Sequence, residues 1–298
     1  MKAGANGRQR GAVLILFFLA LFLSGATVVL SALNNRTGLL ARNVEMQLDM
    51  ELAKEALLSY AMMYPIEYAA GPGRLPCVDT NNDALPDCTA ATLGRLPQRV
   101  ALPSGVPFSL SSAGAGVDQQ FWYAVSTSFR TSAATVNAST AAAFTLDGAA
   151  NVVAVLIAPG TAYAGQTRPS TLAARYLEDS NATGPGFVTR SALANFNDRV
   201  LAITRAELLT AVTPMVAGQM KAYADAAFAG NGNSYPADLT AFRTTVAQGW
   251  VSTNAWHTAL ATYTRVSPTV ATFTFANCGI TFTITNGSNG LGRSQSSC

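Results

Sequence analysis

The sequence predicts an α+β protein in which a long N-terminal helix, apolar in its first half and amphipathic in its second, packs on an antiparallel sheet. Three observations support this fold class. Residues 12–33 are apolar and uncharged. Residues 36–63 continue with apolar side chains at helical spacing. Residues 270–285 alternate apolar and polar side chains, as the strands of a hairpin do.

The first element is the apolar segment "AVLILFFLALFLSGATVVLSAL", residues 12–33. As a helix it would be about 33 Å long, enough to cross the hydrocarbon core of a bilayer. Lys2, Arg8 and Arg10 precede it, and this basic flank predicts a cytoplasmic N-terminus with the remainder exported. A secretory signal has a shorter apolar stretch before its cleavage site. Cleavage after Ala32, within "LSALNN", is the alternative.

The helical pattern continues beyond the apolar segment. Its apolar stripe consists of Leu40, Val44, Leu48, Leu52, Leu57, Ala61 and Tyr64. Its polar side chains on the other faces are Arg42, Glu45, Asp49, Glu51, Lys54 and Glu55. Because this stretch contains no proline before Pro65, we expect one helix over residues 12–63.

Residues 71–88, "GPGRLPCVDTNNDALPDC", are rich in turn-forming residues. Alternating oxygen-bearing side chains within them have a spacing that suits Ca²⁺. These candidate ligands are Asp79, Asn81, Asp83 and Asp87. The EF-hand pattern fails, because Ala84 and Ala90 stand where Gly and Glu are required. A calcium site and a plain Asp/Asn-rich turn therefore both stay open.

The four cysteines form two local pairs, Cys77 with Cys88 and Cys278 with Cys298. Neither pair has CxxC spacing, and the single histidine, His257, cannot complete a Cys/His zinc site. We therefore expect two local disulfides formed in an oxidising compartment. Four buried free thiols are the alternative.

Strands are expected over residues 121–126, 144–146 and 152–158. The last of these, within "VVAVLIA", is continuously apolar and therefore suits a central strand. The hairpin "VATFTFANCGITFTIT" should turn at residues 277–279. Long surface loops are expected over residues 160–190 and 230–240.

A second helix should begin near Thr204, because "TRAE" is a capping box in which Glu207 reaches back to the helix start. We expect it to run toward Phe228, with a kink or restart at Pro214. The helix and the Gly-rich turn after it loosely repeat the pattern of residues 51–76. Either a second unit of the same kind or chance similarity in an Ala-rich chain explains this repeat.

The composition excludes several classes of function. Only 12% of residues are charged, and the net charge of +3 equals the contribution of Lys2, Arg8 and Arg10. No basic patch remains for nucleic acid. No nucleophile motif accompanies His257, and no carboxylate pair, P-loop or dinucleotide motif is present, so we predict no enzyme. Trp122, Trp250 and Trp256 are either core residues or contacts for carbohydrate or a partner.

The N-terminus resembles that of a type IV pilin or type II secretion pseudopilin precursor: a basic leader ends at Gly11, an apolar run starts at Ala12, and an amphipathic helix follows. The pieces "LGRLPQRVALP", "FWYAVS", "AVLIAPG", "YLED" and "FNDRVLAITRAEL" also resemble bacterial prepilin-like proteins. The resemblance implies a pilin-like domain, cleavage between Gly11 and Ala12 by prepilin peptidase, and N-methylation of Ala12. Pilins also often have a C-terminal disulfide loop, which agrees with the Cys278–Cys298 pairing.

Two positions depart from the pattern of major pilins. Ala12 stands where they begin with Phe, and Leu16 stands where they have Glu. A buried carboxylate facing a neighbour's amine would set the register of stacked subunits. Its absence indicates a minor subunit with a tip or priming role.

The expected organisation is a leader over residues 1–11, a helix over 12–63 that crosses the membrane over 12–33, a pilin-like α+β domain over 64–195, and a helix-plus-hairpin region over 196–298. The second pilin-like unit, if real, would lie in the last region.

We therefore predict a non-enzymatic, prepilin-like subunit of a type IV pilus or type II secretion system. It would be a single-pass protein of the bacterial inner membrane, with a periplasmic C-terminal domain. Its partners would be that membrane, prepilin peptidase and other pilin or pseudopilin subunits, but no nucleic acid. No cofactor is expected beyond the candidate Ca²⁺. The alternatives are a membrane-anchored periplasmic binding domain that does not polymerise, and a secreted enzyme released by signal peptidase.

Overall fold

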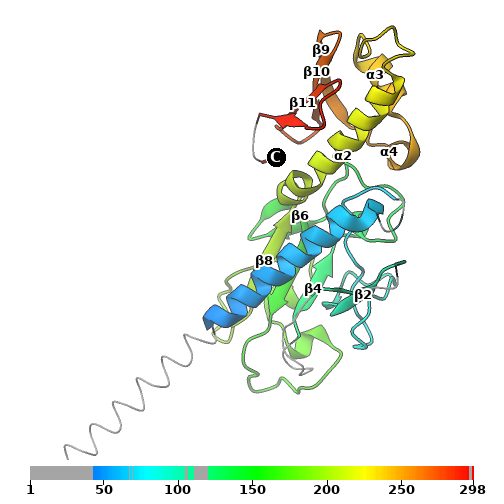
Figure 1. The fold of residues 1–298 in the computed structure, drawn as a ribbon. Helices are drawn as coiled ribbons and strands as arrows, with labels where there is room; N and C mark the ends of the chain where they lie inside the picture. Colours follow the sequence, from blue (N-terminus) through cyan, green and yellow to red (C-terminus); the bar gives the residue numbers. More distant parts are fainter. Residues whose placement is uncertain (1–42, 67, 69, 105–106, 111–119, 295–296) are drawn as a thin grey trace, which may run out of the picture. The chain divides into compact units, whose positions relative to one another are not determined.

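A computed structural model describes residues 43–66, 68, 70–104, 107–110, 120–294 and 297–298 (Figure 1). The predicted leader, the cleavage at Gly11, the methylation of Ala12 and the predicted span over 12–33 lie outside these residues. The chain divides into two compact units, residues 1–48 and 49–298. The description below concerns the second unit, apart from the exposure of two residues in the first.

Residues 43–66 are helical. The side chains that the second unit buries on this helix are Met50, Ala53, Lys54, Leu57, Leu58, Tyr60, Ala61 and Tyr64. Leu52, by contrast, is 56% exposed. Val44 and Leu48 of the first unit are 66% and 61% exposed.

The predicted stripe is therefore correct from Leu57 onward and wrong at Val44, Leu48 and Leu52. At about 100° per residue, the side chains of Leu52 and Leu48 point about 140° and 180° away from that of the buried Leu57. They therefore lie on the side of the helix opposite to its buried face. Lys54, expected on the polar face, is also buried.

The predicted fold class needs correction. In the part of the chain that the structure describes, no helix is both long and apolar enough to cross a membrane. The described helix over 43–66 carries charged side chains among its apolar ones, as an amphipathic helix does. The chain is α+β, but the predicted membrane-spanning helix is not part of the described fold. The larger sheet is also mixed rather than antiparallel.

The larger sheet has the order β1–β4–β6–β5–β7, with β8 also paired to β6. Its strands are β1 (Leu93–Arg95), β4 (Trp122–Val125), β5 (Phe144–Leu146), β6 (Ala149–Ala158), β7 (Gly186–Phe187) and β8 (Arg199–Thr204). All pairs are antiparallel except β5 with β7. A parallel pair requires a long connection, and the chain between β6 and β7 supplies it. A separate hairpin joins β2 (Arg99–Ala101) to β3 (Pro107–Ser109).

Strand β6 is the centre of this sheet, as predicted from its continuous apolar run. Residues 152–158 are buried without exception, because both faces of the strand are covered. On one face, Trp122, Val155 and Ile157 pack with Tyr176 and other residues of the long loop after β6. Helix α2 (Arg205–Ala227) contacts β6 and β8.

The long loop after β6 has little regular structure. Its short 3₁₀ helices are η3 (Ala173–Arg175) and η4 (Asp179–Ala182), while η2 (Thr127–Phe129) follows β4. The predicted surface loop over 160–190 is therefore confirmed in outline, although Tyr176, Leu177 and Glu178 within it are buried.

Helix α2 begins at the predicted capping box. Thr204 accepts a hydrogen bond from the backbone of Glu207, and Glu207 in turn accepts one from the backbone of Thr204. Pro214 lies inside the helix without ending it, so the expected restart does not occur. Beyond α2 follow α3 (Leu239–Val246) and α4 (Gly249–Thr253).

The second sheet is an antiparallel meander in the order β12–β11–β10–β9. Its strands are β9 (Leu260–Ser267), β10 (Val270–Phe275), β11 (Thr281–Thr285) and β12 (Gly292–Arg293). The predicted hairpin is confirmed by β10 and β11. Phe273, Phe275 and Phe282 face the core, where their rings contact one another.

Strand β8, which follows the predicted domain boundary at residue 195, pairs with β6, which precedes it. Helix α2 contacts both β6 and β11. That residues 64–195 form a domain of their own stays a prediction.

Candidate functional site

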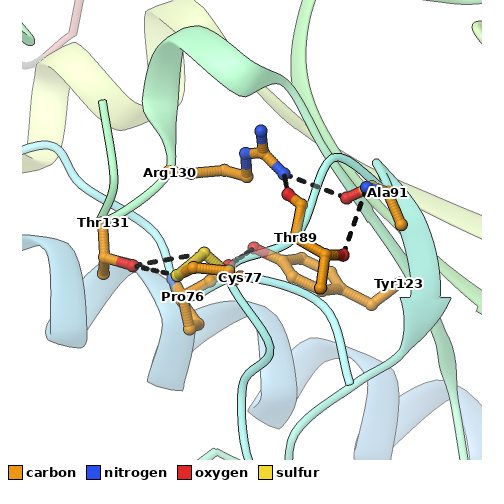
Figure 2. The surroundings of a disulfide bond; sticks show 8 residues. Pro76, Cys77, Thr89, Ala91, Tyr123, Arg130 and Thr131 are labelled. Atoms are coloured by element: carbon orange, nitrogen blue, oxygen red, sulfur yellow. Dashed lines mark hydrogen bonds between the residues drawn. A yellow bond between two sulfur atoms is a disulfide. The ribbon is translucent and has the colours of Figure 1, made fainter. Parts of the chain in front are cut away.

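The first disulfide closes the turn-rich loop that the sequence analysis singled out. Cys77 and Cys88 are bonded, with their Sγ atoms 2.01 Å apart. Figure 2 shows the hydroxyl of Thr131 facing both sulfurs, at 3.4 Å from Cys77 and 3.2 Å from Cys88. Cys77 is fully buried, whereas Cys88 is exposed. The disulfide therefore joins the surface end of the loop to the core.

The predicted calcium ligands form hydrogen bonds within their own loop. Asp79 accepts from the backbone N–H groups of Asn82 and Ala84, at 2.6 and 2.8 Å. Asp87 accepts from the backbone and the hydroxyl of Thr80, at 2.8 and 2.7 Å. Asn81 and Asp83 likewise bond main-chain N–H groups two residues ahead. These side chains thus form the framework of a turn.

The pKa values of Asp79, which is buried, and Asp87, which is half-buried, shift in opposite directions. Burial raises the pKa of Asp79, although its backbone hydrogen bonds lower it in part. The hydrogen bonds from Thr80 lower the pKa of Asp87. Among the described residues, no group of three or more acidic, cysteine or histidine side chains is arranged to hold a metal. Calcium binding at this loop stays a prediction.

Arginines bind the irregular segments around the disulfide. Arg130 donates from Nη1 to the carbonyl oxygens of Thr89 and Ala91, at 2.7 and 3.0 Å (Figure 2). Arg74 is buried and donates to the carbonyl oxygens of Gly71, Ala133 and Ala134. Burial lowers the pKa of Arg74. Both guanidinium groups therefore satisfy loop carbonyls that have no secondary-structure partner.

A cavity of about 350 Å³ borders the disulfide-closed loop. We name it the tyrosine cavity, and it is lined by Tyr60, Tyr64, Tyr68, Leu85, Pro86, Val100, Ala101 and Thr131. Four segments supply this lining: the helix over 43–66 with Tyr68 after it, the loop over 77–88, strand β2, and the loop after η2, which contributes Thr131. The three tyrosines are spaced four residues apart and line the same cavity.

The tyrosine rings are held in fixed relative positions. Tyr64 and Tyr68 are stacked, with centroids 4.4 Å apart and an interplanar angle of 18°. Tyr60 meets Tyr64 edge to face at 5.8 Å. The hydroxyl of Tyr68 donates to the carbonyl oxygen of Ala101 at 2.9 Å. Burial raises the pKa of Tyr60 and of Tyr64, so both phenols are neutral at physiological pH.

Two buried carboxyl groups, Glu178 and Asp198, meet in the long loop after β6. Asp198 Oδ2 accepts from the backbone N–H of Glu178 at 2.9 Å and from Asn181 at 3.1 Å. Glu178 accepts from Gln166 at 3.0 Å and from the backbone of Asn197 at 3.2 Å. Burial raises the pKa of Asp198 to about 7, and the Glu178 carboxyl contributes to the same shift.

The second disulfide, Cys278–Cys298, links the turn after β10 to the end of the chain. The backbone N–H of Cys298 donates to the hydroxyl of Thr210 at 2.7 Å, so this end is also attached to α2. Both disulfides thus connect the predicted pairs. They are compatible with a periplasmic or secreted protein.

The tryptophans and the histidine considered from the sequence differ in their burial. Trp122 and Trp256 are 2% and 0% exposed, which confirms the core interpretation for both. Trp250 is half-buried. His257 is half-buried, with Nδ1 at 3.3 Å from the carbonyl oxygen of Val251.

The tyrosine cavity was not predicted as a site. The four-residue spacing of Tyr60, Tyr64 and Tyr68 was visible in the sequence and could have indicated it, but nothing in the sequence placed β2 opposite. No family model, curated protein or solved structure gave a significant match to this chain.

Proposed function

We propose that the chain is a non-enzymatic, prepilin-like subunit, a minor pilin or pseudopilin of a type IV pilus or type II secretion system. The basic leader ending at Gly11 and the apolar run starting at Ala12 support this proposal from the sequence. The structural observation that supports it best is an unpartnered stripe on the helix over 43–66.

We name this stripe the outer stripe, and it consists of Leu52, Ala56, Ser59, Met63 and Ile66. Leu52 and Ile66 are 56% and 71% exposed. The three residues between them are half-buried. Their spacing alternates four and three residues, so all five lie within an arc of about 80° on one helix. It is the spacing by which one helix packs along another.

Apolar side chains in this arrangement lose contact with water when a second helix covers them. A subunit that packs helix to helix would use the outer stripe in that way. The two disulfides place the folded part in an oxidising compartment. In our proposal this compartment is the periplasm, residues 12–33 hold the unassembled subunit in the inner membrane, and prepilin peptidase removes residues 1–11.

The first test is the mature N-terminus of the protein from the native membrane fraction, by intact mass and N-terminal peptide mapping. The proposal expects a chain that starts at N-methylated Ala12. A chain that starts at Met1, or beyond residue 30, would contradict it.

The second test concerns the outer stripe. Leu52→Lys places a charge on the stripe at an exposed position, so folding should be retained while incorporation into filaments or pseudopili falls several-fold. Thr264→Lys introduces the same side chain at an exposed position of β9 and serves as the matched control. Equal incorporation of both variants would count against helix-to-helix packing.

The minor role depends on Leu16. A carboxylate introduced there, Leu16→Glu, should increase incorporation along the filament, because it restores a partner for a neighbour's N-terminal amine. If neither incorporation nor abundance changes, the argument for a tip or priming role is lost.

A further inference from the structure

We propose that the tyrosine cavity binds a neutral hexose ring, either free or within a polysaccharide. This inference goes beyond the proposed function and does not depend on filament assembly. Its first basis is size. The cavity of about 350 Å³ lies at the small end of the range of ligand pockets, about 300–1,000 Å³. That volume suits one or two sugar rings.

The second basis is the shape of the cavity. Tyr60 and Val100 are 2% and 5% exposed, so they form a closed floor. Leu85 and Ala101 are exposed and therefore stand at the rim. A compact ring can enter such a space from the rim and reach the aromatic floor.

The third basis is the stacked pair of Tyr64 and Tyr68. An aromatic face has negative partial charge, and the C–H bonds on the face of a sugar ring have positive partial charge. Tyr64 is buried and Tyr68 is half-buried, so Tyr68 supplies the more accessible ring. Because Tyr68 is stacked on Tyr64 and hydrogen-bonded to β2, little side-chain entropy would be lost when a ligand packs against it.

The fourth basis is charge. The lining contains no acidic or basic side chain. The guanidinium of Arg74 lies 5.6 Å from the Tyr64 ring centroid. Its Nη1 and Nη2 donate to the carbonyl oxygens of Gly71, Ala133 and Ala134. A phosphate or carboxylate would therefore find no basic side chain in the lining itself, whereas a neutral polyhydroxyl ring needs none.

The polar groups at the cavity are hydroxyls. Tyr64 and Thr131 supply them beside the aromatic faces, and a hydroxyl can both donate to and accept from a sugar. Proline-rich peptides are the other ligands that aromatic grooves accept. Such a peptide is therefore the competing ligand in the test below.

Saturation-transfer NMR on the purified full-length protein tests this proposal, with maltotriose, cellotriose and chitotriose as probes beside free glucose and N-acetylglucosamine. We expect transfer to the ring protons of at least one sugar. Stronger transfer to a trisaccharide than to its monosaccharide would assign a polysaccharide chain, and equal transfer would assign the single ring. No transfer to any of the five sugars would overturn the proposal, as would binding of decaproline in their place.

Two variants locate the site. Ala101→Phe fills the cavity from its exposed rim and should reduce the sugar signal at least several-fold, whereas Thr264→Phe adds the same side chain at an exposed position of β9 and should not. Tyr64→Phe keeps the ring but removes the hydroxyl and should weaken binding less than Tyr64→Ala, which removes both. Equal signals from Ala101→Phe and Thr264→Phe would overturn the assignment. The test of the mature N-terminus does not depend on sugar binding. A negative sugar result would therefore overturn this inference without bearing on the proposed function.

Discussion

At the residue scale, the pair of Glu178 and Asp198 is the clearest source of pH dependence. The folded-state pKa of Asp198, about 7, lies above its usual value of 3.8. The native state therefore binds a proton that the unfolded state has already released between these pH values. The contribution of Asp198 to stability is therefore fully present below about pH 4 and is lost as the pH rises through 7.

Asp198→Asn should remove this dependence, because an amide is neutral at every pH and its NH₂ group can donate to Glu178. We expect the variant to be more stable than the wild type at pH 8, by up to a few kilocalories per mole, and similar at pH 4. Thermal unfolding followed by circular dichroism at both pH values measures this. Glu55→Gln, which removes an exposed carboxylate, is the control, and an equal gain from it would refute the assignment.

Two glycines provide a matched comparison at the same scale. A Cβ at Gly94 would lie 2.6 Å from the backbone oxygen of Asp79, whereas a Cβ at Gly218 in α2 would meet nothing within 4 Å. Gly94→Ala should cost about 1–3 kcal/mol, since backbone must move. Gly218→Ala should stabilise the protein by about 0.5–1 kcal/mol. Urea denaturation of both variants tests the pair, and the same sign for both would contradict the structure.

At the element scale, the disulfide-closed loop keeps its shape through covalent and hydrogen bonds together. The bond between Cys77 and Cys88 spans 11 residues of sequence. Its removal in the double variant Cys77→Ala/Cys88→Ala should cost about 2–3 kcal/mol, because the unfolded chain regains conformational freedom. The free energy of unfolding in urea measures this loss. A loss below 1 kcal/mol would indicate that the loop is held mainly by the side chains of Asp79 and Asp87.

The start of α2 is also an element with a tertiary role. Lys54 donates to Glu207 at 2.5 Å, so the capping box is joined to the first helix of the second unit. Burial alone would raise the pKa of Glu207, but the hydrogen bonds from Lys54 and Thr204 outweigh it and lower that pKa. Since the folded-state pKa of Glu207 is lowered, its contribution to stability is present at neutral pH. This contribution is lost as the pH falls through that pKa.

Thr204→Ala should therefore destabilise the protein by about 1 kcal/mol at pH 7, as judged by chemical denaturation. Thr244→Ala in α3 is the control, since the exposed hydroxyl of Thr244 donates to the carbonyl oxygen of Thr240 within the same helix. Thr210 in α2 is unsuitable as a control, because its hydroxyl also accepts a hydrogen bond from the backbone of Cys298. Equal costs for Thr204→Ala and Thr244→Ala would refute the role of the cap.

At the scale of the whole second unit, the two sheets share one helix and a set of bridging amides. Asn137 donates to the carbonyl oxygen of Asn254 at 2.9 Å, and Asn277 donates to that of Ala138 at 3.0 Å. Together with the contacts of α2 to β6 and β11, these bonds couple the sheets. We expect near-UV and far-UV circular dichroism to report one coincident thermal transition. Two separated transitions would show that residues 196–298 fold on their own.

The sequence by itself determined the features whose causes are local. Turn chemistry and alternation placed the hairpin of β10 and β11, the capping box placed the start of α2, and cysteines close in the sequence formed their disulfides. The continuous apolar run identified β6 as a central strand. In each case the residues involved lie within about 20 positions of one another, so a short-range pattern contains the information.

Only the tertiary structure decided which faces are covered. The stripe predicted at Val44, Leu48 and Leu52 is exposed, because the second unit covers the opposite face of the helix, which carries Leu57 and Tyr64. Lys54 is buried because Glu207, 153 positions away, lies beside it. The carboxyl pair of Glu178 and Asp198 and the tyrosine cavity depend on loops and strands brought together by the fold. No local sequence pattern predicts such long-range contacts, because the pattern around each residue contains no information about which distant segment will pack against it.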